Sequence, residues 1–365
     1  MHPLPQQPNR HGMLRNRIYY RIKPLIPPNL RLSVRRWFAM RKQDSAGNVW
    51  PILPGSEQVP PNWFGWPDEK RFAVVLTHDV EGAAGVAKCA DVMRLEMERG
   101  FSSSFNFVPE GRYRVPRELR EELQDNGFEV GVHDLKHNGR LFRNRETFRR
   151  GARRINQYLR DWGAVGFRSG FMFHNLEWAH DLDVEYCSCT FDTDPFEPQP
   201  DGVGTIFPFW VQTPNASSKG YKAQEKSGMN EHGPSLTGLG TPKQGYVELP
   251  YTMPQDSTLF LLLNQTSIAI WKKKLDWIAS HGGMVLVNTH PDYMGSCGAH
   301  HSTKYPFERY VELLDYISQE YSGDYWHALP REVASFISEQ PKKPKRTVSR
   351  SDFNGCMELV CGCNP

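Results

Sequence analysis

The sequence predicts an α/β protein with a single distorted (β/α) barrel of about seven strands, preceded by an N-terminal arm. Short apolar runs alternate with amphipathic stretches from Arg71 onward, and this alternation is typical of βαβ units built on a parallel sheet. The chain has 365 residues, of which 39% are hydrophobic. That is enough for a large core, and α/β barrels often use this length as one domain.

The individual elements follow from periodicity and from residues that stop helices. Apolar runs predict strands at Phe72–Thr77, Ser103–Val108, Phe128–Val132, Val165–Arg168, Val184–Cys189 and Met284–Thr289. Helical spacing and terminal glycines predict helices at Ala83–Gly100, Pro116–Gly127, Glu146–Trp162, Asn175–Leu182, Ser267–Ser280, Phe307–Tyr321 and Pro330–Ser338.

Three regions follow from composition. Residues 1–65 form an arm rich in Pro and Arg with no sustained period, and residues 66–340 form the barrel. Within the barrel, residues 212–245 are poor in apolar side chains and are expected to be a mobile insertion. Residues 341–365 are expected to be a disordered tail that carries basic residues and cysteines.

The charge of the chain is uneven, although its net value of +3 is too small to indicate a nucleic-acid partner. No acidic residue precedes Asp44, while basic residues are frequent there. Two interpretations stay open: peripheral contact with an anionic membrane surface, or an arm packed on the domain's own surface, which we favour. Seven cysteines without a disulfide spacing, and no signal-peptide pattern, predict a cytoplasmic protein, with the inner membrane surface as its peripheral alternative.

Two histidines four residues apart, His133 and His137, predict a metal site. In an α-helix, residues at this spacing lie on one face, and two imidazoles there can hold one divalent ion. Asp79 or Glu81, at the end of an apolar run, can add an oxygen ligand. Such a two-histidine, one-carboxylate site leaves a position open for water, which is the composition of a hydrolytic centre.

Polar residues of catalytic types follow directly after several predicted strands. They are Asp79, His133, Arg168, Asp192 and His290. In (β/α) barrels the chemistry lies at the carboxyl ends of the strands. We therefore expect these five side chains at one site.

Five segments, taken in order, resemble the motifs of the polysaccharide deacetylases, the NodB-homology group or carbohydrate esterase family four. The segments are THDVEG (Thr77–Gly82), HDLKH (His133–His137), RSGF (Arg168–Phe171), DTDPFEP (Asp192–Pro198) and LVNTH (Leu286–His290). The resemblance extends over roughly residues 71–338. Within the family, the chain looks most like divergent members associated with surface-polysaccharide assembly.

The resemblance implies a hydrolase that removes an N-acetyl or O-acetyl group from a sugar in a glycan or polysaccharide precursor. It implies Zn²⁺, or another divalent metal, held by Glu81, His133 and His137. Asp79 would act as the general base and His290 as the general acid. An exchange of roles between Asp79 and Glu81 stays open.

The remaining roles concern a charge partner and the substrate. Arg168 would keep a carboxylate ionised by its proximity. Phe171, Asp192 and Asp194 are expected near the substrate, and either aspartate would alternatively orient His290 or Arg168.

Two motifs depart from the family pattern. The family's adjacent Asp-Asp is replaced by Asp79-Val80-Glu81, although residues two apart on a strand still share a face. The family's Arg-x-Pro-Tyr becomes Arg168-Ser-Gly-Phe171, which loses the proline and the phenol. These changes leave two alternatives open: an inactive barrel that binds a glycan or scaffolds a biosynthetic complex, and a hydrolase of a non-sugar amide.

Overall fold

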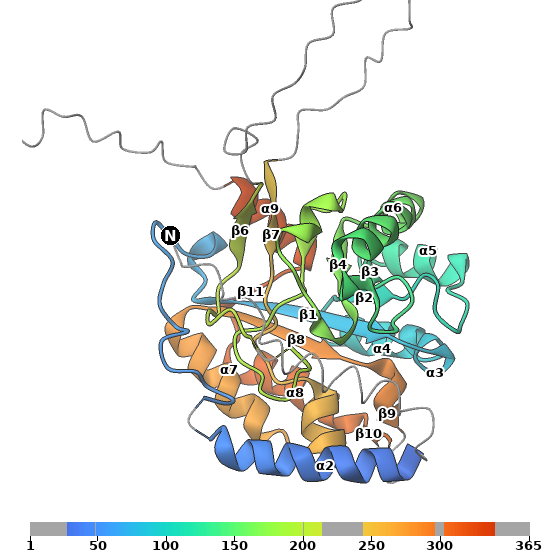
Figure 1. Ribbon diagram of the computed structural model, residues 1–365. Coiled ribbons are helices and arrows are strands. Elements are labelled where there is room, and N and C mark those ends of the chain that lie inside the picture. The colour runs from blue at the N-terminus through green and yellow to red at the C-terminus, as the bar shows by residue number, and fades with distance from the viewer. Residues whose placement is uncertain (1–27, 48, 200, 214–243, 296–302, 340–365) are drawn as a thin grey trace, which may run out of the picture.

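The structure is a computed structural model that describes residues 28–47, 49–199, 201–213, 244–295 and 303–339. Strand β1 (Phe72–Val80) crosses the middle of the molecule (Figure 1) and is buried along its whole length. An uninterrupted run such as FAVVL has no polar face, so it suits a strand that is covered on both sides in a parallel sheet.

Seven parallel strands form the body of the sheet, in the spatial order β8, β1, β2, β3, β4, β5, β7. Their bounds beyond β1 are β2 (Ser104–Phe107), β3 (Glu129–His133), β4 (Gly166–Arg168), β5 (Tyr186–Cys187), β7 (Gly245–Glu248) and β8 (Met284–Thr289). Two more strands complete the sheet as far as the structure describes it. β11 (Tyr325–His327) pairs with the start of β1, and β6 (Phe209–Gln212) pairs antiparallel with β7.

The two ends of this sheet meet just beyond β7. The backbone N–H groups of Thr252 and Met253 donate to the carbonyl oxygen of Leu286 in β8, at 3.4 and 3.2 Å. The Thr252 hydroxyl accepts from the Leu286 N–H at 3.0 Å. These bonds curl the sheet round on itself, so the predicted distorted barrel of about seven strands is confirmed.

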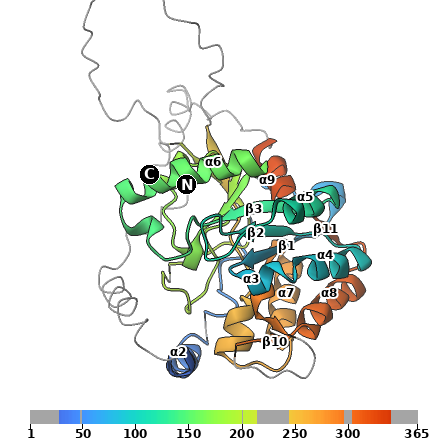
Figure 2. The same ribbon diagram turned by 90° about the vertical axis from the view of Figure 1, so that its right-hand side faces the viewer.

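Helices surround the outside of the sheet (Figure 2). They are α3 (Ala83–Val86), α4 (Cys89–Glu98), α5 (Arg117–Asp125), α6 (Arg145–Trp162), α7 (Ala269–His281), α8 (Glu308–Glu320) and α9 (Pro330–Glu339). Helix α6 illustrates how the sequence sets these bounds. The Asn144 side chain caps it by accepting from the Thr147 N–H at 2.8 Å, and Gly163 ends it at φ 62°.

Two predicted helices have a different form. The single helix expected at Ala83–Gly100 is divided into α3 and α4. The helix expected at Asn175–Leu182 is only a short 3₁₀ turn, η5 (Trp178–Asp181), which the Asn175 side chain begins by accepting from the Trp178 N–H. Strand β5 is also shorter than the predicted Val184–Cys189.

The basic arm contains a helix that the sequence pattern did not predict, α2 (Pro28–Ser45). It lies against the barrel through two basic side chains: Arg36 Nε donates to the carbonyl oxygen of Leu261 at 2.8 Å, and Lys42 Nζ to that of Pro195 at 2.5 Å. No helix among the described residues is long and apolar enough to cross a bilayer. The expected mobile insertion and disordered tail lie almost wholly outside the described residues.

Candidate metal centre and active site

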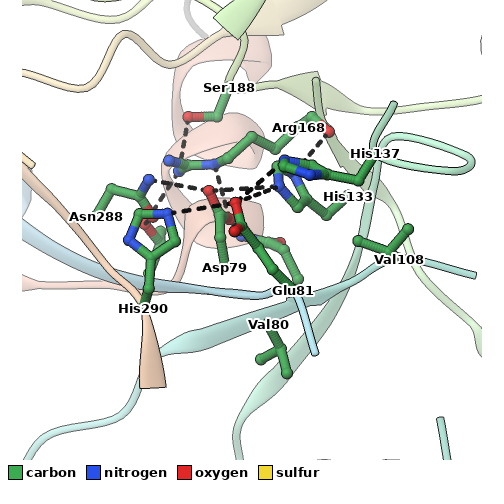
Figure 3. A network of polar contacts seen from close by, with 12 residues as sticks. Asp79, Val80, Glu81, Val108, His133, His137, Arg168, Ser188, Asn288 and His290 are labelled. Atoms are coloured by element: carbon green, nitrogen blue, oxygen red, sulfur yellow. Dashed lines mark hydrogen bonds and ion pairs between the residues drawn. The ribbon is translucent and has the colours of Figure 1, made fainter. Parts of the chain in front are cut away.

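The predicted polar residues of four strands meet at one end of the barrel (Figure 3). Asp79 lies near the end of β1 and Glu81 directly follows that strand, while His133 ends β3, Arg168 ends β4 and His290 directly follows β8. Because the strands are parallel, their carboxyl ends lie at the same edge of the sheet. His78 lies on the opposite face of β1, where its ring nitrogens contact Thr289 and Glu96.

The HDLKH segment is not helical, which corrects the prediction made from its spacing. His133 is the last residue of a strand, and the chain then turns through Asp134 at φ 56° and His137 at φ 46°. The loop nevertheless returns the second imidazole to the first, with ring centroids 4.8 Å apart. The two histidines therefore share a site through a tight loop rather than through one face of a helix.

Gly170 makes room for this loop. A Cβ atom at Gly170 would lie 2.5 Å from Asp134 Oδ2 and 2.8 Å from His137 Cδ2. Phe171, the next residue, stacks on the His137 ring with centroids 4.6 Å apart. The RSGF departure from the family motif thus places a glycine and an aromatic ring directly against the second histidine.

Glu81, His133 and His137 each offer one ligand atom, and these atoms lie within 4.8 Å of one another. Glu81 Oε1 is 3.1 Å from His137 Nε2 and 3.9 Å from His133 Nε2. His133 Nδ1 lies 3.2 Å from the carbonyl oxygen of Arg168 and must donate to it, so that in the neutral imidazole Nε2 carries the lone pair that can bind a metal. That Nε2 is buried and has no hydrogen-bond partner in the part of the chain that the structure describes. The donor set and this orphaned nitrogen both fit a divalent metal such as zinc.

Asp79 is held differently from Glu81. Its Oδ1 accepts from Asn106 Nδ2 at 3.1 Å and its Oδ2 from Asn288 Nδ2 at 2.9 Å. Arg168 Nε lies 3.5 Å from Oδ1. Burial raises the pKa of Asp79, but the charges of His133, Arg168 and His290, with the Asn288 amide, outweigh it and leave the pKa below its usual value. Asp79 is therefore an ionised, tethered carboxylate beside the histidines.

Glu81 is the more accessible carboxylate. Its side chain is 22% exposed, against 3% for Asp79, and His137 is 17% exposed against 3% for His133. Solvent therefore reaches the site from the Glu81 and His137 side. Burial raises the pKa of Glu81, but the charge and hydrogen bond of His137, with the nearby charge of His290, hold it well below the ordinary value.

Arg168 is fully buried and contacts neither solvent nor the surface. Its Nη2 donates to the hydroxyls of Thr77 and Ser188, each at 3.0 Å. Its carbonyl oxygen accepts from the Asp134 N–H at 2.7 Å as well as from His133. The residue thus positions Asp79 through its guanidinium and the histidine loop through its backbone.

His290 is paired with a carboxylate that the sequence analysis missed. Its Nδ1 lies 2.6 Å from Asp256 Oδ1, and its backbone N–H donates to Asp256 Oδ2 at 2.7 Å. Burial lowers the pKa of His290, but the Asp256 charge and hydrogen bond, with Glu81 and Asp79, raise it to about 10. The free Nε2 faces the site, 3.8 Å from Glu81 Oε1.

Asp192 and Asp194 have other partners. Asp192 is buried and pairs with Lys274 at 2.5 Å, and Asp194 accepts from the Tyr251 hydroxyl at 2.8 Å. The prediction that one of them orients His290 is wrong, because Asp256 does so. Asp256 follows a segment for which no strand was predicted, so nothing marked it as part of the edge. Of the two asparagines that bind Asp79, Asn288 could have been predicted from the sequence. It precedes His290 by two residues, and residues two apart on a strand share a face.

Comparisons with known proteins support the fold. No family model matches the chain, and no curated protein matches it. Among solved structures, it is similar to a protein assigned as a polysaccharide deacetylase from Mycobacterium smegmatis, with a TM-score of 0.51 and 17% identity over 77% of this chain and 95% of that one. It is also similar to PuuE allantoinase, with a TM-score of 0.50 and 11% identity over 77% of this chain and 96% of that one.

These likenesses establish the class of fold. The chain is a distorted (β/α) barrel of the polysaccharide deacetylase type, as its five motifs predicted. At such low identity, the likeness speaks for the fold alone, and the activity must be argued from the side chains.

Proposed function

We propose that this protein is a metal-dependent hydrolase that removes an acetyl group from an N-acetylated sugar in a glycan or polysaccharide precursor. The observation that carries the proposal is the convergence of Glu81, His133 and His137 beside a tethered aspartate and a histidine paired with a carboxylate. A zinc ion in such a site supplies a Lewis acid that polarises a carbonyl group and makes water acidic near pH 7.

The two carboxylates have different roles in this proposal. Glu81 is the metal ligand, because its Oε1 faces both histidines. Asp79 is the base, because Asn106 and Asn288 already donate to its two oxygens and keep it in place. It accepts a proton from the attacking water while the remaining hydroxide adds to the acetyl carbonyl carbon.

His290 completes the reaction as the general acid. Asp256 fixes Nδ1, so the proton that His290 gives up is the one on Nε2, which faces the site. As the C–N bond breaks, this proton passes to the leaving nitrogen, and acetate and the free amine are the products. Phe171 is proposed to line the substrate side of the site, since it covers His137. Asp192 and Asp194 would contact the substrate only after giving up their present partners, Lys274 and Tyr251.

The experiment combines metal analysis with acetate release. The native protein should hold about one zinc ion and release acetate from an N-acetylglucosamine oligosaccharide, and His137→Ala should lose both. The matched control is His281→Ala, because His281 is exposed at the end of α7. Acetate release by metal-free native protein would contradict the mechanism.

Two alternatives give different results in the same assay. An inactive barrel that binds or scaffolds would bind the oligosaccharide but release no acetate with any metal. The second alternative is a hydrolase of another amide, which the fold shared with an allantoinase keeps open. It would release no acetate from the oligosaccharide, and acetamido sugars would hardly inhibit its hydrolysis of that other amide. Release of acetate from an O-acetylated sugar would identify an esterase instead.

We further propose a cytoplasmic location, supported by three buried thiols, Cys89, Cys187 and Cys189, that are unpaired within the described chain. Of the two interpretations of the basic arm, we propose packing on the domain's own surface, because Arg36 and Lys42 of α2 donate to carbonyl oxygens of the barrel. Neither the full chain nor a truncation that begins at Pro67 should then float with anionic liposomes. Flotation of the full chain alone would instead favour peripheral contact with the membrane surface.

A further inference from the structure

We propose that Asp292 and Tyr293 form a clamp that makes Glu81 a metal ligand through one oxygen only, Oε1. The inference rests on the proposed metal site and deepens it. It explains how this chain uses a longer carboxylate, two positions after Asp79, where the resembled motif has an aspartate at the next position.

Tyr293 fixes the carboxylate group itself. Its hydroxyl donates to Glu81 Oε2 at 2.9 Å. The other oxygen, Oε1, faces the nitrogen atoms of the site: His137 Nε2 at 3.1 Å, His290 Nε2 at 3.8 Å and His133 Nε2 at 3.9 Å. With Oε2 engaged by the phenol, Glu81 presents a single oxygen to an ion held by the two imidazoles of the loop.

Asp292 fixes the backbone that carries Glu81. Its Oδ2 accepts from the Glu81 N–H at 2.8 Å and its Oδ1 from the Gly85 N–H at 2.9 Å. Two glycines make space for this carboxylate. A Cβ at Gly82 would lie 2.9 Å from Asp292 Oδ1, and a Cβ at Gly85 would overlap the carboxylate group.

The clamp acts where the sheet no longer supports the chain. Strand β1 ends at Val80, so no described strand pairs with the backbone of Glu81. A glutamate also has one more rotatable bond than an aspartate, and fixing it has a higher entropic cost. Hydrogen bonds from groups behind the ligands orient them before the ion binds, and this raises metal affinity.

The clamp and the proposed acid belong to one short turn. Residues Asp292 and Tyr293 lie in η8 (Pro291–Tyr293), directly after His290. The rings of His290 and Tyr293 are in contact, with centroids 5.0 Å apart. The turn therefore sets the distance between the metal ligand and the proton donor.

The test measures zinc affinity of the full chain, stripped of metal, by competition with a chromophoric chelator. Tyr293→Phe removes only the hydroxyl and should weaken zinc binding by about 10- to 100-fold. Asp292→Asn is a second variant for the same assay, and it should also weaken binding because its amide has one accepting oxygen instead of two. Tyr316→Phe is the matched control, since that phenol donates to Asp276 on the outer helices.

A double-mutant cycle separates a clamp from a general effect on folding. In Glu81→Asp the shortened carboxylate should no longer reach the phenol, so adding Tyr293→Phe should cause little further loss of affinity. Equal zinc affinity in the native protein and both clamp variants would overturn the clamp while leaving the metal site intact. Failure of the native protein to bind zinc would overturn the proposed function, and the clamp with it.

Discussion

Replacing Asp256 by asparagine should change the protonation of His290 more than any other single substitution at the site. Asp256 is wholly buried, and its Oδ1 lies 2.6 Å from His290 Nδ1. The pKa of His290 is about 10, against an ordinary value of 6.5. That gap corresponds to about 5 kcal/mol in favour of the imidazolium. Without the Asp256 charge, only the charges of Glu81 and Asp79 oppose the effect of burial, and the pKa of His290 should fall well below about 10.

The assay is a titration of the His290 ring by two-dimensional NMR in metal-free protein. The His290 ring of the native protein should titrate near pH 10, and that of Asp256→Asn at a clearly lower pH. Asp276→Asn is the control, because that carboxylate accepts from two tyrosines on the outer helices and contacts no described histidine of the site. An unchanged His290 titration in Asp256→Asn would refute the reasoning.

Stability should follow the same pair with a definite sign. The pKa of His290 is raised on folding, so its contribution is fully present below about pH 6.5 and is lost as the pH rises through about 10. The melting temperature of Asp256→Asn should therefore differ most from that of the native protein at pH 6, and the difference should shrink toward pH 10. A difference that does not vary with pH would show that only packing was disturbed.

Two further substitutions test the supports of the site and the barrel interior. Gly170→Ala should weaken zinc binding at least about 10-fold, because its Cβ would displace the loop that carries His137. Unchanged zinc affinity would show that the loop can shift without disturbing the position of the His137 ring. Burial raises the pKa of Glu129 to about 7, so its contribution to stability is present below about pH 4.5 and lost as the pH rises through 7. Glu129→Gln is neutral at every pH, so its free energy of unfolding should exceed that of the native protein by up to about 3 kcal/mol at pH 8 and by little at pH 5. An equal gain at both pH values would contradict this.

The sequence was informative wherever a residue's role followed from a buried strand. The alternation along β1 puts Asp79 and Glu81 on the inner face and His78 on the outer face, and the structure has this arrangement. The run before His290 likewise predicted its strand without error at either end. Both depend on local periodicity, which a sequence displays directly.

The sequence was misleading wherever geometry depended on distant partners. A spacing of four residues fits a helix, and nothing in HDLKH shows that Asp134 and His137 adopt positive φ. Asp256 lies outside every predicted strand, and its role exists only because the chain after β7 returns to β8. Helix α2 was missed because its stability comes from packing against the barrel rather than from a regular apolar stripe.

Arg168 holds two halves of the site by two chemically separate means. Its guanidinium lies beside Asp79, while its main-chain oxygen receives both His133 Nδ1 and the Asp134 amide. No exchange of side chain deletes a peptide carbonyl. Shortening this arginine would therefore disturb Asp79, the proposed base, and spare the backbone bonds that anchor the loop to His137, so that the proposed metal binding and the proposed turnover could be changed separately at one position.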